Sequence, residues 1–470
     1  MDTPVTVVIL AAGLGTRMKS RRAKVLHRAG GKTLVEHVLA TALELAPPER
    51  VFVVVGYQGE EVRRAISTPG IGWIEQVEQK GTGHAVLVGR EVLSGLDGYL
   101  VIVYGDGPLL RAQTLRRLIA QAESSQAAAV LLTARLDDPT GYGRVIRDPG
   151  GLVTAIVEQK AATPEQLGIA EANMGIYCFR AELFWNCISE MRPDNPAREY
   201  YLTDMVEILN RHQHTIQALQ IEDAREALGI NTRIELAEVD RLLRERKARQ
   251  LMLSGVTIEK PETVSIDADV CIGMDTVIEP FARILGKTRI GEDCRVGACA
   301  IIEDSELEDE VEIGPFTFVG GSRVGRAARV GPFARLRIGN RVEERAHIGN
   351  FVELKNTWLG ASAKANHLAY LGDAEIGAAT NIGAGTITCN YDGVHKHKTS
   401  IGKQAFIGSN STLVAPIAIG DGAYVAAGSV ITDPVPPDAL ALGRARQVLK
   451  DEWARKRRER LQNERKRRSQ

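Results

Sequence analysis

Aliphatic residues recur at every sixth position through residues 266–431, a period that fits neither an α-helix nor an ordinary strand. One-residue slips and one longer gap interrupt the series, whose members are Ile266, Ile272, Ile278, Ile284, Ile290, Val296, Ile302, Leu307, Ile313, Val319, Val324, Val330, Leu336, Val342, Ile348, Leu354, Ile401, Ile407, Leu413, Ile419, Val425 and Ile431. Glycine often follows the aliphatic residue, as at Gly273, Gly291, Gly297, Gly314, Gly331, Gly349, Gly402, Gly408 and Gly420. This pattern predicts hexapeptide repeats, each of which supplies one short strand.

Such repeats predict a left-handed parallel β-helix. Three hexapeptides make one triangular coil, and the inward aliphatic side chains of one coil stack on those of the next, so that neighbours bury what a single coil cannot. The handedness follows from the type of repeat, because it is an exception to the right-handed crossover rule. A purely structural solenoid remains possible at this point, so the residues in its loops must indicate any function.

The chain before residue 232 has a different pattern. Short runs rich in β-branched residues at 5–10, 51–55, 99–104 and 128–133 alternate with helical patterns. This alternation predicts an α/β domain with a Rossmann-like, mostly parallel sheet covered by helices on both faces. Ligands of such sheets bind at the carboxyl ends of the strands.

A glycine-containing turn with the sequence AAGLGTRM follows the first predicted strand, at residues 11–18. Its glycines allow backbone N–H groups to approach an anionic ligand, and Arg17 with Lys24 can neutralise phosphate charge. A dinucleotide-binding fingerprint would have a third glycine where Met18 stands. A simple tight turn remains the alternative interpretation.

Two polar residues fall at the ends of predicted strands or just before helices. Asp106 follows the strand 99–104, and Asn231 precedes a helical pattern. A carboxylate and an amide oxygen are hard ligands that suit Mg²⁺, which keeps several waters and bridges substrate phosphates. Asp106 could instead only cap a turn.

The stretch 232–253 has aliphatic residues at helical spacing among glutamates and arginines, which predicts a long, exposed linking helix. We therefore expect one domain at residues 1–231, a linker helix at 232–253 and a second domain at 254–470. From Lys450 onward the chain has ten Lys or Arg and four Asp or Glu. This basic tail is predicted to be a solvated helix or a disordered extension.

Composition limits the classes of partner. Lys plus Arg and Asp plus Glu both number 59, so net charge gives no reason to expect nucleic acid as a partner. The six cysteines include no CxxC pair, which favours reduced thiols in a reducing compartment. The start of the chain lacks a basic leader, and no apolar run approaches the roughly 20 residues of a membrane span. We expect a soluble, cytoplasmic protein without membrane insertion.

An ordered set of motifs extends over nearly the whole chain. In the first half they are LAAGLGTRM at 10–18, KVLH at 24–27, QKGTGHA at 79–85, YGDGPL at 104–109, DDPTGYGR at 137–144, VEQK at 157–160, EYYLTD at 199–204 and GIN at 229–231. In the second half they are GPFARLR at 331–337, HIGNFVELK at 347–355, NHLAYLGDAEIG at 366–377 and NIGAGTITCNYDG at 381–393. The set closely resembles the bifunctional bacterial family of N-acetylglucosamine-1-phosphate uridylyltransferase / glucosamine-1-phosphate acetyltransferase enzymes. The first motif alone marks only the wider sugar nucleotidyltransferase group.

The resemblance implies that the first domain is a nucleotidyltransferase. It would transfer a uridylyl group from UTP to N-acetylglucosamine 1-phosphate, with Arg17 and Lys24 as catalytic residues and Mg²⁺ held by Asp106 and Asn231. The residues implied to bind UTP or UDP-N-acetylglucosamine are Leu10, Ala11, Ala12, Gly13, Lys24, Gln76, Gly81, Thr82, Tyr104, Gly105, Asp106, Gly141, Glu158, Asn173 and Asn231. The attacking sugar phosphate is already a nucleophile, so catalysis reduces to in-line positioning and charge neutralisation.

Three residues depart from the family pattern. Leu14 stands where a lysine is often found, Ala23 replaces the proline that usually precedes the lysine at position 24, and Gly107 replaces an apolar residue. Loss of one charge from the phosphate loop would raise the UTP concentration that the enzyme needs. None of the three removes an implied metal ligand.

The resemblance implies that the second domain transfers acetyl from acetyl-CoA to the amine of glucosamine 1-phosphate, with His367 as general base. An ammonium must lose a proton before it attacks a thioester, and histidine titrates near neutral pH. Ala365 interrupts the aliphatic series beside His367, which favours function over a satisfied core histidine. The sugar phosphate would contact Arg337, Lys355, Tyr370 and Asn381. Acetyl-CoA would contact Ala384, Asn390, Tyr391, Ser409, Ala427 and Arg444.

The polar stretch 390–400 is predicted to leave the coil as a loop that could reach a neighbouring subunit. His395 and His397, like His212 and His214, have no further ligands at metal spacing and are predicted to lie on solvated surface. The flat faces of a triangular coil predict a homotrimer with closed symmetry. The resemblance places the acetyl-transfer site between subunits.

Two other functions remain to be weighed. One is a nucleotidyltransferase with a structural, non-catalytic β-helix, and the other is a regulatory subunit that keeps both folds without catalysis. His367 with Asn390 and Tyr391 argues against the first, and the intact GTRM loop with Asp106 and Asn231 argues against the second. The favoured pathway is synthesis of precursors for cell-envelope polysaccharides.

Overall fold

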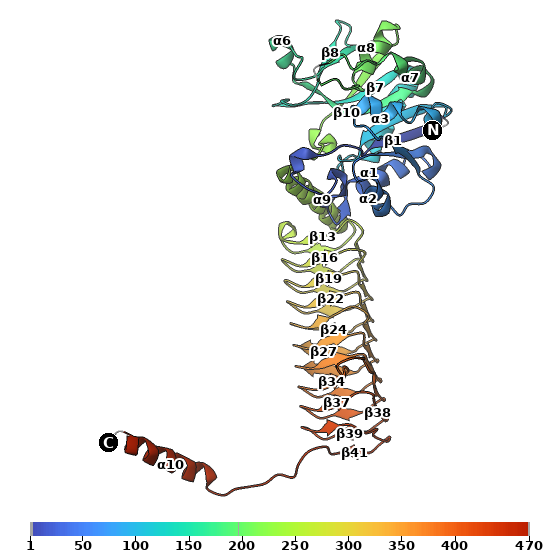
Figure 1. Ribbon diagram of the computed structural model, residues 1–470. Helices are drawn as coiled ribbons and strands as arrows, with labels where there is room; N and C mark the ends of the chain where they lie inside the picture. The colour runs from blue at the N-terminus through green and yellow to red at the C-terminus, as the bar shows by residue number, and fades with distance from the viewer. Residues whose placement is uncertain (1–2, 196, 469–470) are drawn as a thin grey trace. The chain divides into compact units, whose positions relative to one another are not determined.

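The computed structural model describes residues 3–195 and 197–468. The chain divides into two compact units, Met1–Arg249 with Ile266–Ala268, and Gln250–Ser265 with Asp269–Gln470. Each unit has a distinct architecture (Figure 1): a sheet flanked by helices in the first, and stacked coils in the second. The assignment of one activity to each domain, with the boundaries expected from the sequence, remains a prediction.

The first unit is built on a sheet with the strand order β11-β7-β10-β6-β1-β4-β5. The strands are β1 (Val5–Leu10), β4 (Val51–Val55), β5 (Gly72–Glu75), β6 (Tyr99–Tyr104), β7 (Ala129–Arg135), β10 (Glu171–Arg180) and β11 (Ile216–Ile221). Pairing is parallel along this path except on both sides of β10, which is antiparallel to β6 and β7. An antiparallel pair, β8 (Arg144–Arg147) and β9 (Val153–Val157), joins the sheet through β10. The mostly parallel sheet expected from the sequence is confirmed along the central path.

Helices cover both faces of this sheet. The first unit contains α1 (Leu34–Leu43), α2 (Gly59–Ala65), α3 (Thr82–Leu87), α4 (Arg90–Leu93), α5 (Ala112–Ser125), α6 (Pro164–Leu167), α7 (Ala181–Cys187) and α8 (Asp204–Arg211), and α9 (Arg233–Leu253) begins in it. One apolar core joins alternate residues of β1 to α1, α2 and α5, and a second joins the intervening residues to α3, α4, α7 and α8. All of β1 is therefore buried, because successive side chains point to opposite covered faces.

The second unit is a left-handed parallel β-helix whose strands lie between β12 (Thr257–Ile258) and β41 (Leu440–Ala441). Within the described residues these strands form three parallel sheets in which each strand pairs with the third strand after it, except at the end, where β39 (Tyr424–Val425) pairs with β41. The sixth-position aliphatic residues predicted to face inward are buried almost throughout, with Ile278, Val296 and Ile348 at 0% exposure. The repeat interpretation is confirmed.

The glycine that often follows the aliphatic residue has a packing reason. A Cβ atom at Gly349 would lie 1.9 Å from the carbonyl oxygen of Asn366 in the next coil, a distance that no side chain tolerates. The corners of the coils also bring equivalent residues into register. Phe316, Phe333 and Phe351 stack along one corner, with ring centroids 5.1 and 5.5 Å apart.

The basic tail contains α10 (Trp453–Arg468), whose described side chains are exposed on all sides. This agrees with the solvated helix that the charge pattern predicts. No helix in the described part of the chain combines the length and apolar character that a membrane span requires.

Candidate active sites

The end of β1 lies beside the end of β6, where the first unit could bind a nucleotide. The backbone N–H of Gly105 donates to the carbonyl of Leu10 at 2.9 Å, and that of Ala11 donates to Val54 at 2.9 Å. Ala11 and Ala12 are buried, whereas the chain opens at Gly13, where a Cβ atom would meet no other atom within 4 Å. The carboxyl ends of the two strands thus present backbone and small side chains to the same space.

The turn after β1 depends on one glycine. Gly15 has a φ of 61°, and a Cβ atom there would lie 2.6 Å from Cβ of Lys24. The turn then enters a short 3₁₀-helix, Thr16–Met18, in which Met18 is only 1% exposed. Met18 packs in a small apolar cluster, so the position of a third glycine is occupied by a core residue.

Four residues from distant parts of the chain converge beside this turn. Lys24 Nζ forms a short ion pair with Asp106 Oδ2 and donates to Asn231 Oδ1 at 3.0 Å. Arg17 Nη2 donates to the same Asn231 oxygen at 2.8 Å. The amide nitrogen of Asn231 donates to the carbonyl of Gly229 at 3.3 Å, which holds Oδ1 toward the two cations.

This cluster fits a hard divalent cation. The carboxylate oxygen of Asp106 and the amide oxygen of Asn231 both contact the ammonium group of Lys24. The two oxygens are therefore close enough to bind one cation together. Oxygen donors of this kind are the ligands that Mg²⁺ prefers. Asp106 and Asn231 are thus brought together as the sequence predicted, with Arg17 and Lys24 around them.

The residues implied to hold the uridine end also lie together. Gln76 is 3% exposed, and its Nε2 donates to the carbonyl of Gly81 at 3.1 Å and to His84 Nδ1 at 3.1 Å. Gly81 has a φ of 102°, and a Cβ there would lie 2.5 Å from the carbonyl oxygen of Tyr200. Thr82 Oγ1 accepts from the backbone N–H of Leu202 at 3.1 Å, which joins this loop to the segment before α8.

A group of acidic and aromatic side chains lies where the sugar is expected. Burial raises the pKa of Glu158, and this effect outweighs a hydrogen bond with Thr203 that lowers the pKa. Burial, and then Asp106 and Glu158, raise the pKa of Tyr104 well above its ordinary value. Burial, and then Glu207 and Glu158, raise the pKa of Asp204 to about 6. Asp204 ends the motif EYYLTD, from which the sequence indicated no site residue.

The remaining residues of the predicted sugar site flank this group. Asn173 Nδ2 donates to Tyr177 Oη at 2.8 Å, and the N–H of Gly175 donates to Asn173 Oδ1 at 3.2 Å, so both ends of the amide are engaged. Gly141 lies in an exposed loop with a φ of 88° and donates to Gln159 Oε1 at 3.2 Å. It is anchored to the turn that carries Glu158.

The three departures from the family pattern have different structural consequences. Leu14 is 51% exposed. The N–H of Ala23 donates to Gln58 Oε1 at 2.6 Å, a bond that proline could not make. A Cβ at Gly107 would meet no atom closer than 3.7 Å, so the fold leaves room for a side chain there.

In the β-helix, cationic and acidic side chains gather on one sheet. Arg337 follows β25 (Arg335–Leu336), and its Nη1 donates to Glu353 Oε1 at 3.2 Å. Lys355 lies on β28 (Glu353–Lys355), with Nζ 3.7 Å from Asp373 Oδ2. Asn390 Nδ2 donates to the same Asp373 oxygen at 2.5 Å.

A second lysine lies beside Lys355. Lys396 comes from the exposed part of the predicted loop 390–400. This loop ends two residues earlier than predicted, because Thr399 and Ser400 belong to β35 (Thr399–Ile401) of the coil. Its pKa is lowered by the adjacent Lys355. Asp373 and Lys396 were not singled out from the sequence, because only the tertiary structure places them beside Lys355.

His367 lies at a corner between two sheets. It ends β30 (Lys364–His367), and Tyr370 begins β31 (Tyr370–Gly372) on the next face. His367 is exposed, and its Nδ1 lies 2.8 Å from Asn350 Oδ1 on β27 (His347–Asn350). An amide oxygen only accepts hydrogen bonds, so Nδ1 carries the proton and Nε2 is left as an acceptor. Asn381 lies on the same sheet, where it pairs with Lys364.

Three of the residues implied to contact acetyl-CoA occupy equivalent positions in successive coils. Asn381, Phe406 and Tyr424 are register partners, so Ala384, Ser409 and Ala427 follow them at the same offset. All three residues have small side chains. Tyr391 is 60% exposed in the 390–400 loop, and Arg444 is exposed in the segment after β41.

Fold and sites define a class: a nucleotidyltransferase domain followed by a hexapeptide-repeat transferase domain. A MobA-like NTP transferase domain family matches residues 7–184. The bacterial transferase hexapeptide (six repeats) family matches residues 269–304, and the hexapeptide repeat of succinyl-transferase matches residues 398–433.

Curated relatives extend the match to the whole chain. The bifunctional protein GlmU of Solibacter usitatus is 68% identical over 458 residues, which cover 97% of this chain and 98% of the relative. GlmU of Koribacter versatilis is 50% identical over 455 residues, covering 96% and 97%. GlmU of a Nostoc species is 45% identical over 455 residues, covering 96% and 99%. The chain belongs to the GlmU family of bifunctional proteins.

Proposed function

We propose that this enzyme acetylates glucosamine 1-phosphate with acetyl-CoA and then transfers uridylyl from UTP to N-acetylglucosamine 1-phosphate. The products are UDP-N-acetylglucosamine and pyrophosphate, which would serve synthesis of cell-envelope polysaccharide precursors in the cytoplasm. The observation that carries the proposal is the match to bifunctional GlmU proteins through both units, at 68% identity over 97% of the chain. The geometry of each unit supports its own half of the reaction.

In uridylyl transfer, the first unit supplies position and charge. Gln76 and the backbone around Gly81 would bind the uracil edge, and Glu158 with Asn173 would bind the sugar. Bound at Asp106 and Asn231, Mg²⁺ would neutralise charge that develops on the phosphates. Arg17 and Lys24 would contact the same phosphates. The sugar phosphate attacks as an anion, so no protein base is required.

In acetyl transfer, His367 solves a protonation problem. The substrate amine is an ammonium near neutral pH and has no lone pair for the thioester carbonyl. The bond from Nδ1 to Asn350 leaves Nε2 to accept a proton from the ammonium, so that the free amine can attack the thioester carbonyl. The C–S bond of the thioester would then break, and CoA would leave as its thiol after taking up the second proton of the amine. Arg337 and Lys355 would bind the sugar phosphate, with Tyr370 and Asn381 as further contacts.

The acetyl donor would lie along the corner of small residues. Ala384, Ser409 and Ala427 would contact its extended chain, and a main-chain donor near Ala384 would stabilise the oxyanion. Asn390, Tyr391 and Arg444 would complete the contacts. We further propose a homotrimer in which the loop 390–400 and Arg444 reach a neighbouring site, because closed symmetry satisfies the flat faces of triangular coils.

One preparation tests both halves of the proposal. Purified protein should release free thiol from acetyl-CoA with glucosamine 1-phosphate, and pyrophosphate from UTP with N-acetylglucosamine 1-phosphate and Mg²⁺. Pyrophosphate without thiol would identify the alternative function, a nucleotidyltransferase with a structural β-helix. Absence of both products from folded protein would contradict catalysis altogether.

A further inference from the structure

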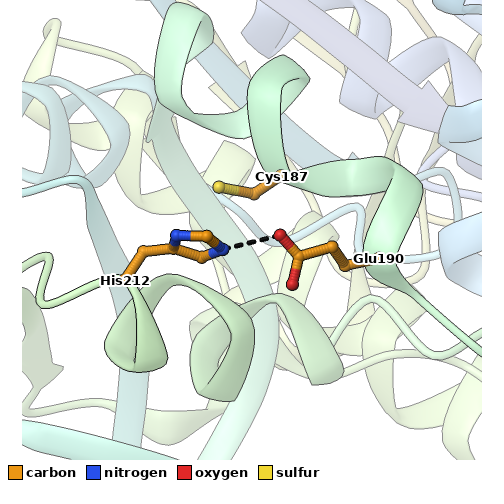
Figure 2. A group of neighbouring side chains, drawn as sticks. All are labelled: Cys187, Glu190 and His212. Atoms are coloured by element: carbon orange, nitrogen blue, oxygen red, sulfur yellow. Dashed lines mark hydrogen bonds and ion pairs between the residues drawn. The ribbon is translucent and has the colours of Figure 1, made fainter.

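Apart from the two sites above, three side chains with metal-ligating atoms converge in the first unit. Cys187 ends α7, Glu190 lies in the 3₁₀-helix that follows (Ile188–Glu190), and His212 follows α8. One ligating atom from each residue lies within 4.8 Å of the other two. Figure 2 shows the side chains pointing toward one another from separate helical segments.

An ordinary ion pair accounts for only two of the three residues in this cluster. His212 Nε2 lies 2.6 Å from Glu190 Oε1, which accounts for two of the three groups. The buried residue Cys187 adds a thiol on the same side (Figure 2). The His212 side chain is 47% exposed and that of Glu190 is 41% exposed, so a solvated ion could reach the cluster.

We propose that Cys187, Glu190 and His212 form a binding site for a divalent transition metal ion of the zinc class. A thiolate, an imidazole and a carboxylate are the ligands that zinc accepts, with bond lengths of about 2.0 to 2.3 Å. Tetrahedral geometry places such atoms about 3.3 to 3.8 Å apart, and the three ligating atoms lie within 4.8 Å of one another, so side-chain rotations of this order would bring them to the required spacing. Three protein ligands leave one position for water. The thiol proton of Cys187 leaves to solvent when the metal–sulfur bond forms.

The location suggests what the metal does. Glu190 immediately precedes, and α8 immediately follows, the segment that contains Tyr200. The carbonyl of Tyr200 accepts from the N–H of Gly83 at 2.8 Å, and its N–H donates to the carbonyl of Lys80 at 2.8 Å. A metal that joins Glu190 to His212 therefore ties the start of this segment to the end of α8, the helix that follows it, and so restrains the segment that packs on the loop around Gly81.

Cobalt titration of the full-length, EDTA-treated protein tests the site directly, without nucleotide or Mg²⁺. We expect one thiolate-bound Co²⁺ per chain, measured by a thiolate-to-cobalt charge-transfer band that Zn²⁺ displaces. Co²⁺ bound only by oxygen atoms, as at Asp106 and Asn231, gives no such band. Cys187→Ser should abolish the band, and His212→Ala, which removes one of the three proposed ligands, should weaken Co²⁺ binding. His212 is exposed, so its replacement leaves folding intact even if the serine variant does not fold. Bound metal should also slow tryptic cleavage at the exposed Arg198.

Matched variants separate this cluster from adventitious binding. Cys271→Ser removes an exposed thiol elsewhere and should leave the band unchanged, as should His395→Ala. Absence of a thiolate band in excess Co²⁺, or a band that survives in Cys187→Ser, overturns the metal site. Equal rates of tryptic cleavage at Arg198 with and without bound metal would contradict the proposal that the metal restrains this segment. Mg²⁺-dependent pyrophosphate release by the parental protein is measured in a separate assay. If the protein released no pyrophosphate, the proposed function would be contradicted, but the Co²⁺ titration could still be interpreted.

Discussion

The backbone N–H of Ala23 donates a 2.6 Å hydrogen bond to Oε1 of Gln58, and Gln58 Nε2 donates in turn to the carbonyl of Arg21 at 2.8 Å. Ala23 is 1% exposed and immediately precedes Lys24. The bond links the segment before Lys24 to Gln58, the residue that precedes α2, although the two partners are 35 positions apart in the sequence. A proline, which the family usually has here, would lack the donor.

We therefore expect Ala23→Pro to destabilise the first unit, although φ of −53° at Ala23 suits proline. Leaving Gln58 Oε1 without its donor should cost about 1 to 3 kcal/mol in the free energy of unfolding. Thermal and urea unfolding would measure the loss. In a Gln58→Leu background the same proline should cost much less, because the bond is already absent. Additive costs would contradict the role of the bond.

Asp106→Ala should reduce Mg²⁺-dependent uridylyl transfer by at least about 100-fold, because it removes a proposed metal ligand and releases Lys24 from its ion pair. Acetyl transfer should remain near normal. Asp97→Asn is the matched control, since Asp97 pairs with Arg50 at 2.7 Å and is largely exposed. Pyrophosphate release across a Mg²⁺ series provides the measurement. Equal loss of both activities would indicate misfolding.

His367→Ala should lower kcat for acetyl transfer by roughly 10²- to 10⁴-fold, the usual contribution of a general base. Binding of both substrates should change little, and uridylyl transfer should be unaffected. His214→Ala is the control, because His214 lies in the first unit, outside the proposed acetyl-transfer site. Steady-state thiol release at several pH values checks this. Acetylation at the parental rate across neutral pH would reduce His367 to a structural residue.

Asp204 should make the stability of the first unit fall as pH rises from about 4 to about 6. Burial and the nearby Glu207 and Glu158 raise its pKa from 3.8 to about 6, so the folded state binds a proton that the unfolded state has already released. Unfolding at about pH 4.5, near the lower end of this window, and at about pH 7, above it, measures the difference. Asp204→Asn should flatten the profile, and Glu207→Gln should move the fall to lower pH. An unchanged profile in Asp204→Asn would contradict this assignment.

A fragment ending at Leu253 should keep uridylyl transfer and lose acetyl transfer. The first unit has its own apolar cores on both faces of the sheet, which supports independent folding. The fragment also loses the 2.8 Å ion pair between Arg244 and Asp267, so a fragment ending at Ala268 should unfold at higher denaturant. A folded fragment without pyrophosphate release would contradict the domain interpretation.

The sequence by itself determined the β-helix, because a six-residue period is a local pattern that each coil repeats. It also determined the buried strand at 5–10 and the helix at 232–253, whose observed bounds are Val5–Leu10 and Arg233–Leu253. The placement of β10 between β6 and β7, antiparallel to both, was not predicted. Strand direction and order depend on which distant segments pair, and periodicity along one strand carries no such information.

Only the tertiary structure decided which side chains meet. Asn350 and His367 are 17 residues apart, and the length of one coil places them side by side. Lys24 and Asn231 meet across 207 residues because separate loops end at the same edge of the sheet. His212 was predicted as solvated surface without further ligands at metal spacing. Spacing along the chain does not reveal Cys187 and Glu190 beside it, because the packing of α7 against α8 brings them there.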